Sequence, residues 1–179
     1  MNEAGQPFSK KEALTAFFKL MATGFATGAK PELFPRFPGD ESTKRHVWQD
    51  DSGWLGIDEW RTTPLGDGSN GTTSLYFVGT PVWEMQYGGY YPERAMPVLR
   101  QALALNYTNQ RWFGGRGHGT LGVGNFIYHN LPVAGIDGEG WGNFSEFSGT
   151  EYIEEYAARE WLTIGIHYYR GGFLIKPPT

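Results

Sequence analysis

The sequence contains no cysteine, and that absence removes several kinds of chemistry. Such a chain forms no disulfide and has neither a thiolate nucleophile nor a cysteine-type zinc site. Four histidines are present, but they lie far apart and lack the His-x-x-x-His spacing typical of a zinc site on a helix. We therefore expect no metal and no cofactor. The histidines are His46, His118, His129 and His167.

Charge is also sparse, and no sign dominates. Charged residues make up 19% of the chain and the formal net charge is −4, so the basic surface that nucleic acid requires is missing. No apolar run approaches the roughly 18 residues of a membrane-spanning helix, and the first residues lack the pattern of a signal peptide. We expect a cytoplasmic protein that binds neither nucleic acid nor membrane.

Aromatic residues and glycine are abundant by contrast. Aromatic residues make up 16% of the sequence, and there are 26 glycines. Aromatic and β-branched side chains favour strands, and glycine favours the turns between them. We predict an α+β fold: a twisted, largely antiparallel sheet of about eight strands, built from two similar four-strand units, with two packed helices. The rings can either fill the core or line a ligand groove.

We predict a single α+β domain over residues 1–179, divided into four segments. Residues 1–8 form a flexible start and residues 9–91 the first half. Residues 92–125 hold a helix and a glycine-rich connection, and residues 126–175 form the second half.

Two segments carry helix signals. Ser9 and Glu12 form a capping-box pattern before a helix that we predict over residues 10–23. Its apolar residues recur at the spacing of one helical face. Pro92 suits the first position of a second helix that runs to about Leu105. The apolar face of the first helix consists of Leu14, Phe17, Phe18 and Met21.

The most informative strand signal is a hairpin over residues 74–91. In its second arm, apolar and polar residues alternate with the period of a strand that has one buried face. The end of the chain repeats this plan: an alternating strand, a tyrosine, Gly-Gly and an aromatic residue. We align Met85 with Ile166 and Tyr87 with Tyr168 and predict a weak duplication, although chance similarity between hairpins would give the same pattern. Further strands are predicted over 126–131, 143–147, 150–156 and 161–169, and a loop over 135–142.

The segment 107–125 is rich in glycine and contains Arg116 and His118. Such a loop can wrap its backbone amides around a phosphate, but no Walker or dinucleotide-binding pattern is present. The alternative is a flexible connection between the two halves.

The candidate site follows from the alternation in the two matching strands. If Ile166 and Tyr168 face the core, then His167 and Tyr169 share the opposite face with the polar residues of the hairpin. Arg116 and His118 could close over that face and hold an anion. A solvated polar face of the sheet is the competing interpretation. No catalytic residue is assigned. The predicted ligand-binding residues are Glu84, Gln86, Arg116, His118, His167 and Tyr169.

Several motifs together resemble a bacterial family of unknown function, the domain of unknown function 5680 family. The strings Gly79–Gly89 (Gly-x-Pro-Val-Trp-x-Met-x-Tyr-x-Gly), Arg116-Gly117 and Phe147–Glu151 carry the resemblance, which spans Ala13 to Phe173. The chain resembles a stand-alone member, without the helix-turn-helix domain that some relatives carry. The resemblance implies an α+β domain and supplies no catalytic residues. His118 departs from it, since proline is usual after Arg-Gly.

Three functions stay open from the sequence. The first is a small-molecule-binding or sensing domain, whose partner is a small-molecule ligand. The second is an enzyme that uses Glu84 and His167 as an acid–base pair. The third is a protein-interaction module, in which a homodimer would form through exposed aromatic residues or a sheet edge. Other neighbouring carboxylates, such as Asp58 and Glu59, point to opposite faces of a strand and form no pair.

Overall fold

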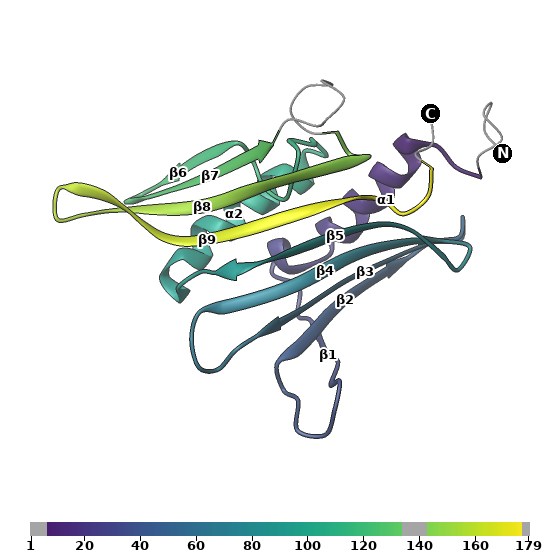
Figure 1. The fold of residues 1–179 in the computed structure, drawn as a ribbon, viewed down its shortest axis with the longest axis horizontal. Coiled ribbons are helices and arrows are strands. Elements are labelled where there is room, and N and C mark those ends of the chain that lie inside the picture. The colour runs from purple at the N-terminus through teal and green to yellow at the C-terminus, as the bar shows by residue number, and fades with distance from the viewer. Residues whose placement is uncertain (1–6, 134–142, 177–179) are drawn as a thin grey trace.

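The computed structural model describes residues 7–133 and 143–176 and contains one antiparallel sheet of nine strands with two α-helices (Figure 1). The strand order is β1-β2-β3-β4-β5-β9-β8-β7-β6. The elements are α1 (Lys10–Ala22), η1 (Phe25–Thr27), β1 (Glu32–Leu33), β2 (Thr43–Gln49), β3 (Trp54–Thr62), β4 (Gly68–Phe77), β5 (Thr80–Tyr90), η2 (Glu93–Ala95), α2 (Met96–Thr108), β6 (Thr120–Val123), β7 (Phe126–Val133), β8 (Glu146–Ala157) and β9 (Glu160–Phe173), where η marks a 3-10 helix.

The sheet consists of two four-strand meanders of the same plan. Strands β2 to β5 form one and strands β6 to β9 the other, and the last strands of the two, β5 and β9, pair with each other at the centre. Each meander follows a helix, and both helices cover the same face of the sheet (Figure 1). The predicted α+β fold with two four-strand units is therefore confirmed, and the two-residue β1 extends one edge.

Helix α1 begins as the sequence predicts. Ser9 and Glu12 form the capping box, with the Ser9 amide donating to Glu12 Oε2 at 2.6 Å, and the helix ends at Ala22. The flexible start expected over residues 1–8 does not extend to Phe8, which is buried against Trp54 with 5.0 Å between the ring centroids. Residues 1–6 lie outside the described residues.

The second helical segment differs in detail from the prediction. Pro92 precedes the short helix η2, and α2 then runs from Met96 to Thr108, past the expected end at Leu105. Its buried face packs over the second half and against η1. Neither α-helix exceeds 13 residues, and none in the described part of the chain is long and apolar enough to span a membrane.

Two strand predictions in the second half need correction. Residues 143–147 and 150–156 were expected as separate strands, yet β8 is continuous from Glu146 to Ala157. Strand β6, Thr120–Val123, lies in the segment expected to be a glycine-rich connection. Glycine within these runs weakens the strand signal, and pairing with neighbouring strands overrides it. The loop predicted over 135–142 lies outside the described residues.

The predicted orientation of β9 is wrong. Tyr168 is 61% exposed, whereas His167 and Tyr169 are buried. Strand β9 carries aromatic or aliphatic residues on both faces, so alternation alone does not orient it. The inner face is set by packing: a Cβ on Gly165 would lie 2.5 Å from Cδ1 of Tyr91, so only glycine fits there.

Candidate functional site

A cavity of about 250 Å³ lies between the sheet and the helical layer. Its walls are mainly apolar, and its polar groups come from β3, β4, β5, β9, the glycine-rich loop before β6, the turn before β4, and the two helical segments η2 and α2. A mostly apolar cavity with a few convergent polar groups is the usual form of a small-molecule site. It is lined by Met21, Phe25, Ala26, Asp58, Trp60, Thr62, Gly66, Asp67, Gly68, Ser69, Tyr87, Tyr91, Glu93, Met96, Leu99, Leu103, Tyr107, Arg116 and His167.

The glycine-rich loop is packed into the core, which corrects the expectation of a flexible connection. Residues 114–117 are all buried. A Cβ on Gly115 would lie 2.3 Å from Cζ of Tyr169, and one on Gly117 would lie 2.1 Å from the hydroxyl oxygen of Tyr128. The two glycines therefore let the backbone lie against two tyrosine rings. In this position of the loop, the side chain of Arg116 is buried inside the protein.

Two asparagines fix the backbone of this loop. Asn106 Nδ2 donates to the Arg116 carbonyl at 2.9 Å, and Asn130 Nδ2 donates to the Gly117 carbonyl at 3.1 Å. The Tyr169 hydroxyl donates to Asn130 Oδ1 at 2.6 Å. Tyr169 thus holds the loop in place and does not line the cavity.

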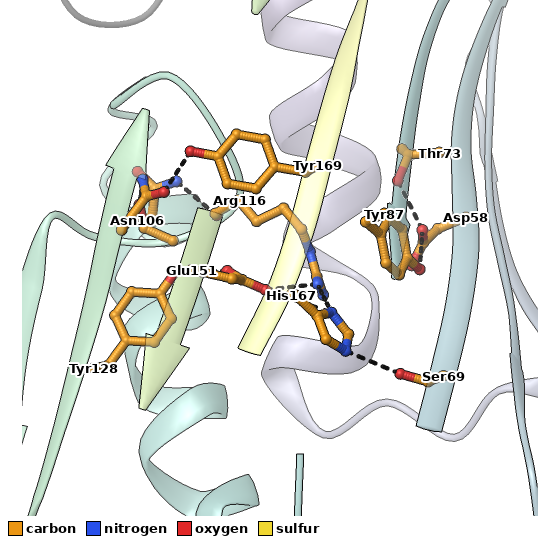
Figure 2. Close-up of polar contacts among 12 residues, drawn as sticks. Asp58, Ser69, Thr73, Tyr87, Asn106, Arg116, Tyr128, Glu151, His167 and Tyr169 are labelled. Atoms are coloured by element: carbon orange, nitrogen blue, oxygen red, sulfur yellow. Dashed lines mark hydrogen bonds and ion pairs between the residues drawn. The ribbon is translucent and has the colours of Figure 1, made fainter. Parts of the chain in front are cut away.

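Arg116 forms a buried ion pair with Glu151 (Figure 2). The two side chains are 7% and 0% exposed, and Nη1 lies 2.7 Å from Oε1. The other carboxylate oxygen, Oε2, accepts from the Tyr128 hydroxyl at 2.6 Å. Burial lowers the pKa of Arg116, but the Glu151 carboxylate and the surrounding tyrosines together outweigh burial and the pKa is raised, so the guanidinium keeps its charge.

His167 is the next member of this cluster, and it is neutral. Burial, with a further contribution from the charge of Arg116, lowers the pKa of His167 to about 3. Arg116 Nη1 lies 2.9 Å from Nδ1, and since a guanidinium only donates, Nδ1 is the acceptor. The ring proton is therefore assigned to Nε2, which donates to Ser69 Oγ at 3.2 Å.

A second buried carboxylate, Asp58, lies across the cavity from this cluster. Its Oδ1 accepts from Thr73 Oγ1 at 2.7 Å and from the Tyr87 hydroxyl at 3.0 Å. None of the described residues donates to Oδ2. Burial raises the pKa of Asp58, although the hydrogen bond from Thr73 and the charge of Arg116 oppose the shift. Asp58 is 4% exposed and lines the cavity, so Oδ2 is an acceptor at the cavity wall.

The guanidinium of Arg116 also has a hydrogen-bond donor without a partner among the described residues. Its Nη1 serves Glu151 and His167, its plane lies over the Tyr87 ring with Cζ 4.1 Å from the centroid, and no described residue accepts from Nη2. The Tyr107 hydroxyl lies near the guanidinium but forms no hydrogen bond of normal length and angle. Arg116 therefore presents an unused donor where it lines the cavity.

The structure brings together only two of the six predicted ligand-binding residues. Arg116 and His167 line the cavity. Glu84 and Gln86 lie on the opposite face of the sheet, where Gln86 Nε2 donates to Glu84 Oε1 at 3.0 Å. The predicted convergence of these two with His167 and Tyr169 is therefore wrong, and so is the Glu84–His167 acid–base pair.

His118 is the remaining predicted residue. Its Nδ1 lies 3.1 Å from the Thr120 carbonyl, its ring packs on Phe113, and it does not line the cavity. The expected closure of Arg116 and His118 over an anion is not formed. No three His, Asp or Glu side chains in residues 7–133 and 143–176 are grouped to hold a metal ion.

Asp58, Ser69 and Tyr87 were missed as site residues. The sequence excludes an Asp58–Glu59 pair correctly, because neighbouring strand residues point to opposite faces. The alternation of strand residues also gives a signal for the site, because it places Asp58 in the buried row of β3 with Trp54 and Gly56. An acidic residue in an otherwise apolar buried row indicates a special role.

The comparisons with known proteins add no relative. No protein-family model, curated protein or solved structure matches this chain. The resemblance to the domain of unknown function 5680 family stays a prediction.

Proposed function

We propose that this protein binds a small molecule with a largely apolar body in the cavity between the sheet and α2, as a binding or sensing domain. The observation that carries the proposal is the pair of unused polar atoms at the wall of an apolar cavity, Arg116 Nη2 and Asp58 Oδ2. A ligand that pairs with both atoms would form two hydrogen bonds inside the cavity, each worth about 0.5–1.5 kcal/mol net.

The volume limits the size of the ligand. Cavities for drug-sized ligands span roughly 300–1,000 Å³, and this one is about 250 Å³. A compound of one or two rings fits this space. The sensing role draws on the resemblance to a family whose members also occur behind regulator domains.

Native and denaturing mass spectrometry of the purified protein tests the proposal. We expect extra mass that is retained in the native spectrum and lost on denaturation. Leu103→Trp should prevent that retention, because Leu103 lines the cavity and the larger ring fills it. Leu105→Trp is the matched control, since Leu105 lies on the same helix and is exposed.

A circular dichroism spectrum of each variant establishes that it is folded. If Leu103→Trp is not, Leu99→Phe at the neighbouring wall position replaces it. A ligand that stays bound in a folded cavity-filling variant would place the binding site elsewhere. If no ligand co-purifies, a thermal-shift screen of small aromatic and aliphatic compounds gives the same comparison between the variants.

An enzyme is the second candidate, with Asp58 in place of the separated Glu84–His167 pair. Asp58 has one oxygen directed to the cavity, and burial raises the pKa of its carboxyl, which suits general acid–base chemistry. Asp58→Asn should abolish turnover of any substrate identified, with the fold retained. Full activity in that variant would exclude this role. The protein-interaction module and the homodimer stay predictions.

A further inference from the structure

We propose that the ligand of this cavity is neutral and presents a hydrogen-bond acceptor to Arg116 beside a donor to Asp58, as an amide, a lactam or a urea does. This inference rests on the proposed function and names its ligand class.

The charges around the cavity disfavour an anion. Arg116 is the single cation among the described residues that line the cavity, and Glu151 already pairs with it at 2.7 Å. The lining contains three carboxylic residues, Asp58, Asp67 and Glu93, and His167 is neutral. An anionic ligand would add negative charge to a buried site whose positive charge is already balanced, which is costly in a low-dielectric interior.

A ligand with only donors fits equally poorly. The guanidinium at the cavity wall presents hydrogens and repels a cation, so its unused Nη2 requires an acceptor. Asp58 Oδ2 requires a donor when the carboxyl is ionised. A neutral group that carries both kinds of atom satisfies the two sites without adding charge.

Tyr87 holds the two polar sites in one place. Its ring lies under the guanidinium of Arg116 at 4.1 Å, and its hydroxyl donates to Asp58 at 3.0 Å (Figure 2). The donor and the acceptor are therefore held against the face and the hydroxyl end of the same side chain. Ser69 adds a hydroxyl, whose oxygen already accepts from His167 and whose proton is free to donate.

The walls specify the rest of the ligand. Trp60, Met96 and Leu99 provide apolar surface away from the polar groups. An uncharged ring or short aliphatic chain attached to the amide-like group would bury against them.

Four probes of similar size test the inference by calorimetry or ligand-observed NMR: benzamide, benzoate, benzamidine and toluene. We expect benzamide to bind at least about tenfold more tightly than toluene, which corresponds to one or two net hydrogen bonds. Benzoate should bind most weakly, because it adds a charge and has no donor for Asp58.

Asp58→Asn sharpens the test because it replaces an acceptor at the cavity wall with a donor. We expect this variant to lose about tenfold in benzamide affinity and to gain affinity for benzoate, which can then accept from both sites. Glu59→Gln is the matched control, since Glu59 is the next residue of β3 and lies on the opposite face. It should leave all four affinities unchanged.

Each other outcome has a definite meaning. If toluene binds as tightly as benzamide, the cavity binds apolar molecules as proposed, but the inferred ligand class is wrong. If benzoate or benzamidine binds best, the ligand is charged and the inference is overturned. If none of the four binds at millimolar concentration and no ligand co-purifies, the proposed function itself fails.

Discussion

Each half of this protein buries one carboxylate on the inner face of the sheet, and the two differ in how they are used. In the second half, both oxygens of Glu151 have partners, Arg116 on one and Tyr128 on the other. In the first half, both hydrogen bonds to Asp58 reach the same oxygen, and Oδ2 is left at the cavity wall. The two halves share a plan, yet both oxygens of Glu151 have partners, whereas Oδ2 of Asp58 has none among the described residues.

This difference gives the two carboxylates different roles: Glu151 stabilises the fold, and Asp58 is the proposed contact for a ligand. Glu151 serves to keep the charge of Arg116 inside the protein, where that side chain can present Nη2 to the cavity. Asp58 contributes less to the fold, because its neighbours Thr73 and Tyr87 would also hydrogen-bond to a neutral amide in its place. Substitutions at the two positions should therefore have different consequences.

The largest effect should come from Glu151→Gln. Removing one charge of a buried pair leaves the other uncompensated, and we expect the free energy of unfolding to fall by about 3–5 kcal/mol. Urea denaturation measures the loss. Glu155→Gln on the same strand is the control, because its pair with Arg94 is exposed and is worth at most about 1 kcal/mol. Similar losses in the two variants would show that the Arg116–Glu151 pair does not stabilise the second half of the protein.

Acid should lower the stability of the protein through protonation of His167, which contacts Arg116 in the same cluster. The pKa of this residue falls from 6.5 to about 3 on folding, so the unfolded chain binds the proton more readily. Its contribution is present above pH 6.5 and decreases as the pH falls towards 3. At pH 4 the loss should be about 3 kcal/mol, at roughly 1.4 kcal/mol per pKa unit.

Urea denaturation between pH 7 and pH 4 checks this dependence against a variant. His167→Gln keeps an acceptor for Arg116 and a donor for Ser69 but does not titrate, so its stability should fall less with acid. His118→Gln, on the loop, should keep the full dependence. An unchanged slope in His167→Gln would mean that His167 is not the residue that senses acid.

Gly117→Ala should lower the stability of the second half, because it displaces the glycine-rich loop that contains Arg116. The new Cβ would lie 2.1 Å from the Tyr128 hydroxyl oxygen, and overpacking of this kind costs about 1–3 kcal/mol. Thermal unfolding measures it, and Gly119→Ala in the same loop is the control, because no atom lies within 4 Å of a Cβ there. If both variants melt at the same temperature, the loop is more adaptable than its packing indicates.

The smallest effect on stability should come from Asp58→Asn. Because burial raises the pKa of Asp58, its stabilising contribution is complete below its ordinary pKa of 3.8 and is lost as the pH rises through the raised pKa of the folded state. The variant does not titrate, so at pH 7 we expect its unfolding free energy to lie within about 0.5 kcal/mol of the original or above it. Glu84→Gln, on the opposite face of the sheet, is the control. A loss of several kcal/mol at Asp58 would assign it the same structural role as Glu151.

Much of the fold could be predicted from local patterns. The capping box at Ser9, the helical apolar face that follows it and the hairpin alternation around Met85 are each contained within a few residues. The repeat of the hairpin plan was enough to predict two four-strand units.

The site was less accessible, for a physical reason. Strand β9 has hydrophobic side chains on both faces, so the burial of His167 depends on contacts with Tyr91 and Arg116, which lie far away in the sequence. The glycines around Arg116 are typical of a mobile loop. In the structure, two tyrosine rings occupy the space where their side chains would be, and the sequence does not indicate this contact. Asp58 gives a local signal, its place in the buried row of β3, but the rule for neighbouring strand residues only excludes its pair with Glu59.

The pairing of β5 with β9 joins strands from the middle and the end of the chain. Asp58, Ser69 and Tyr87 lie on one side of this junction, and Arg116 and His167 come from the other. The cavity is therefore completed only when the two halves have docked, and contacts between such distant segments form slowly. During refolding, the proposed ligand binding should return in the last phase, after the secondary structure of each half has formed, and such a ligand should slow the separation of the halves.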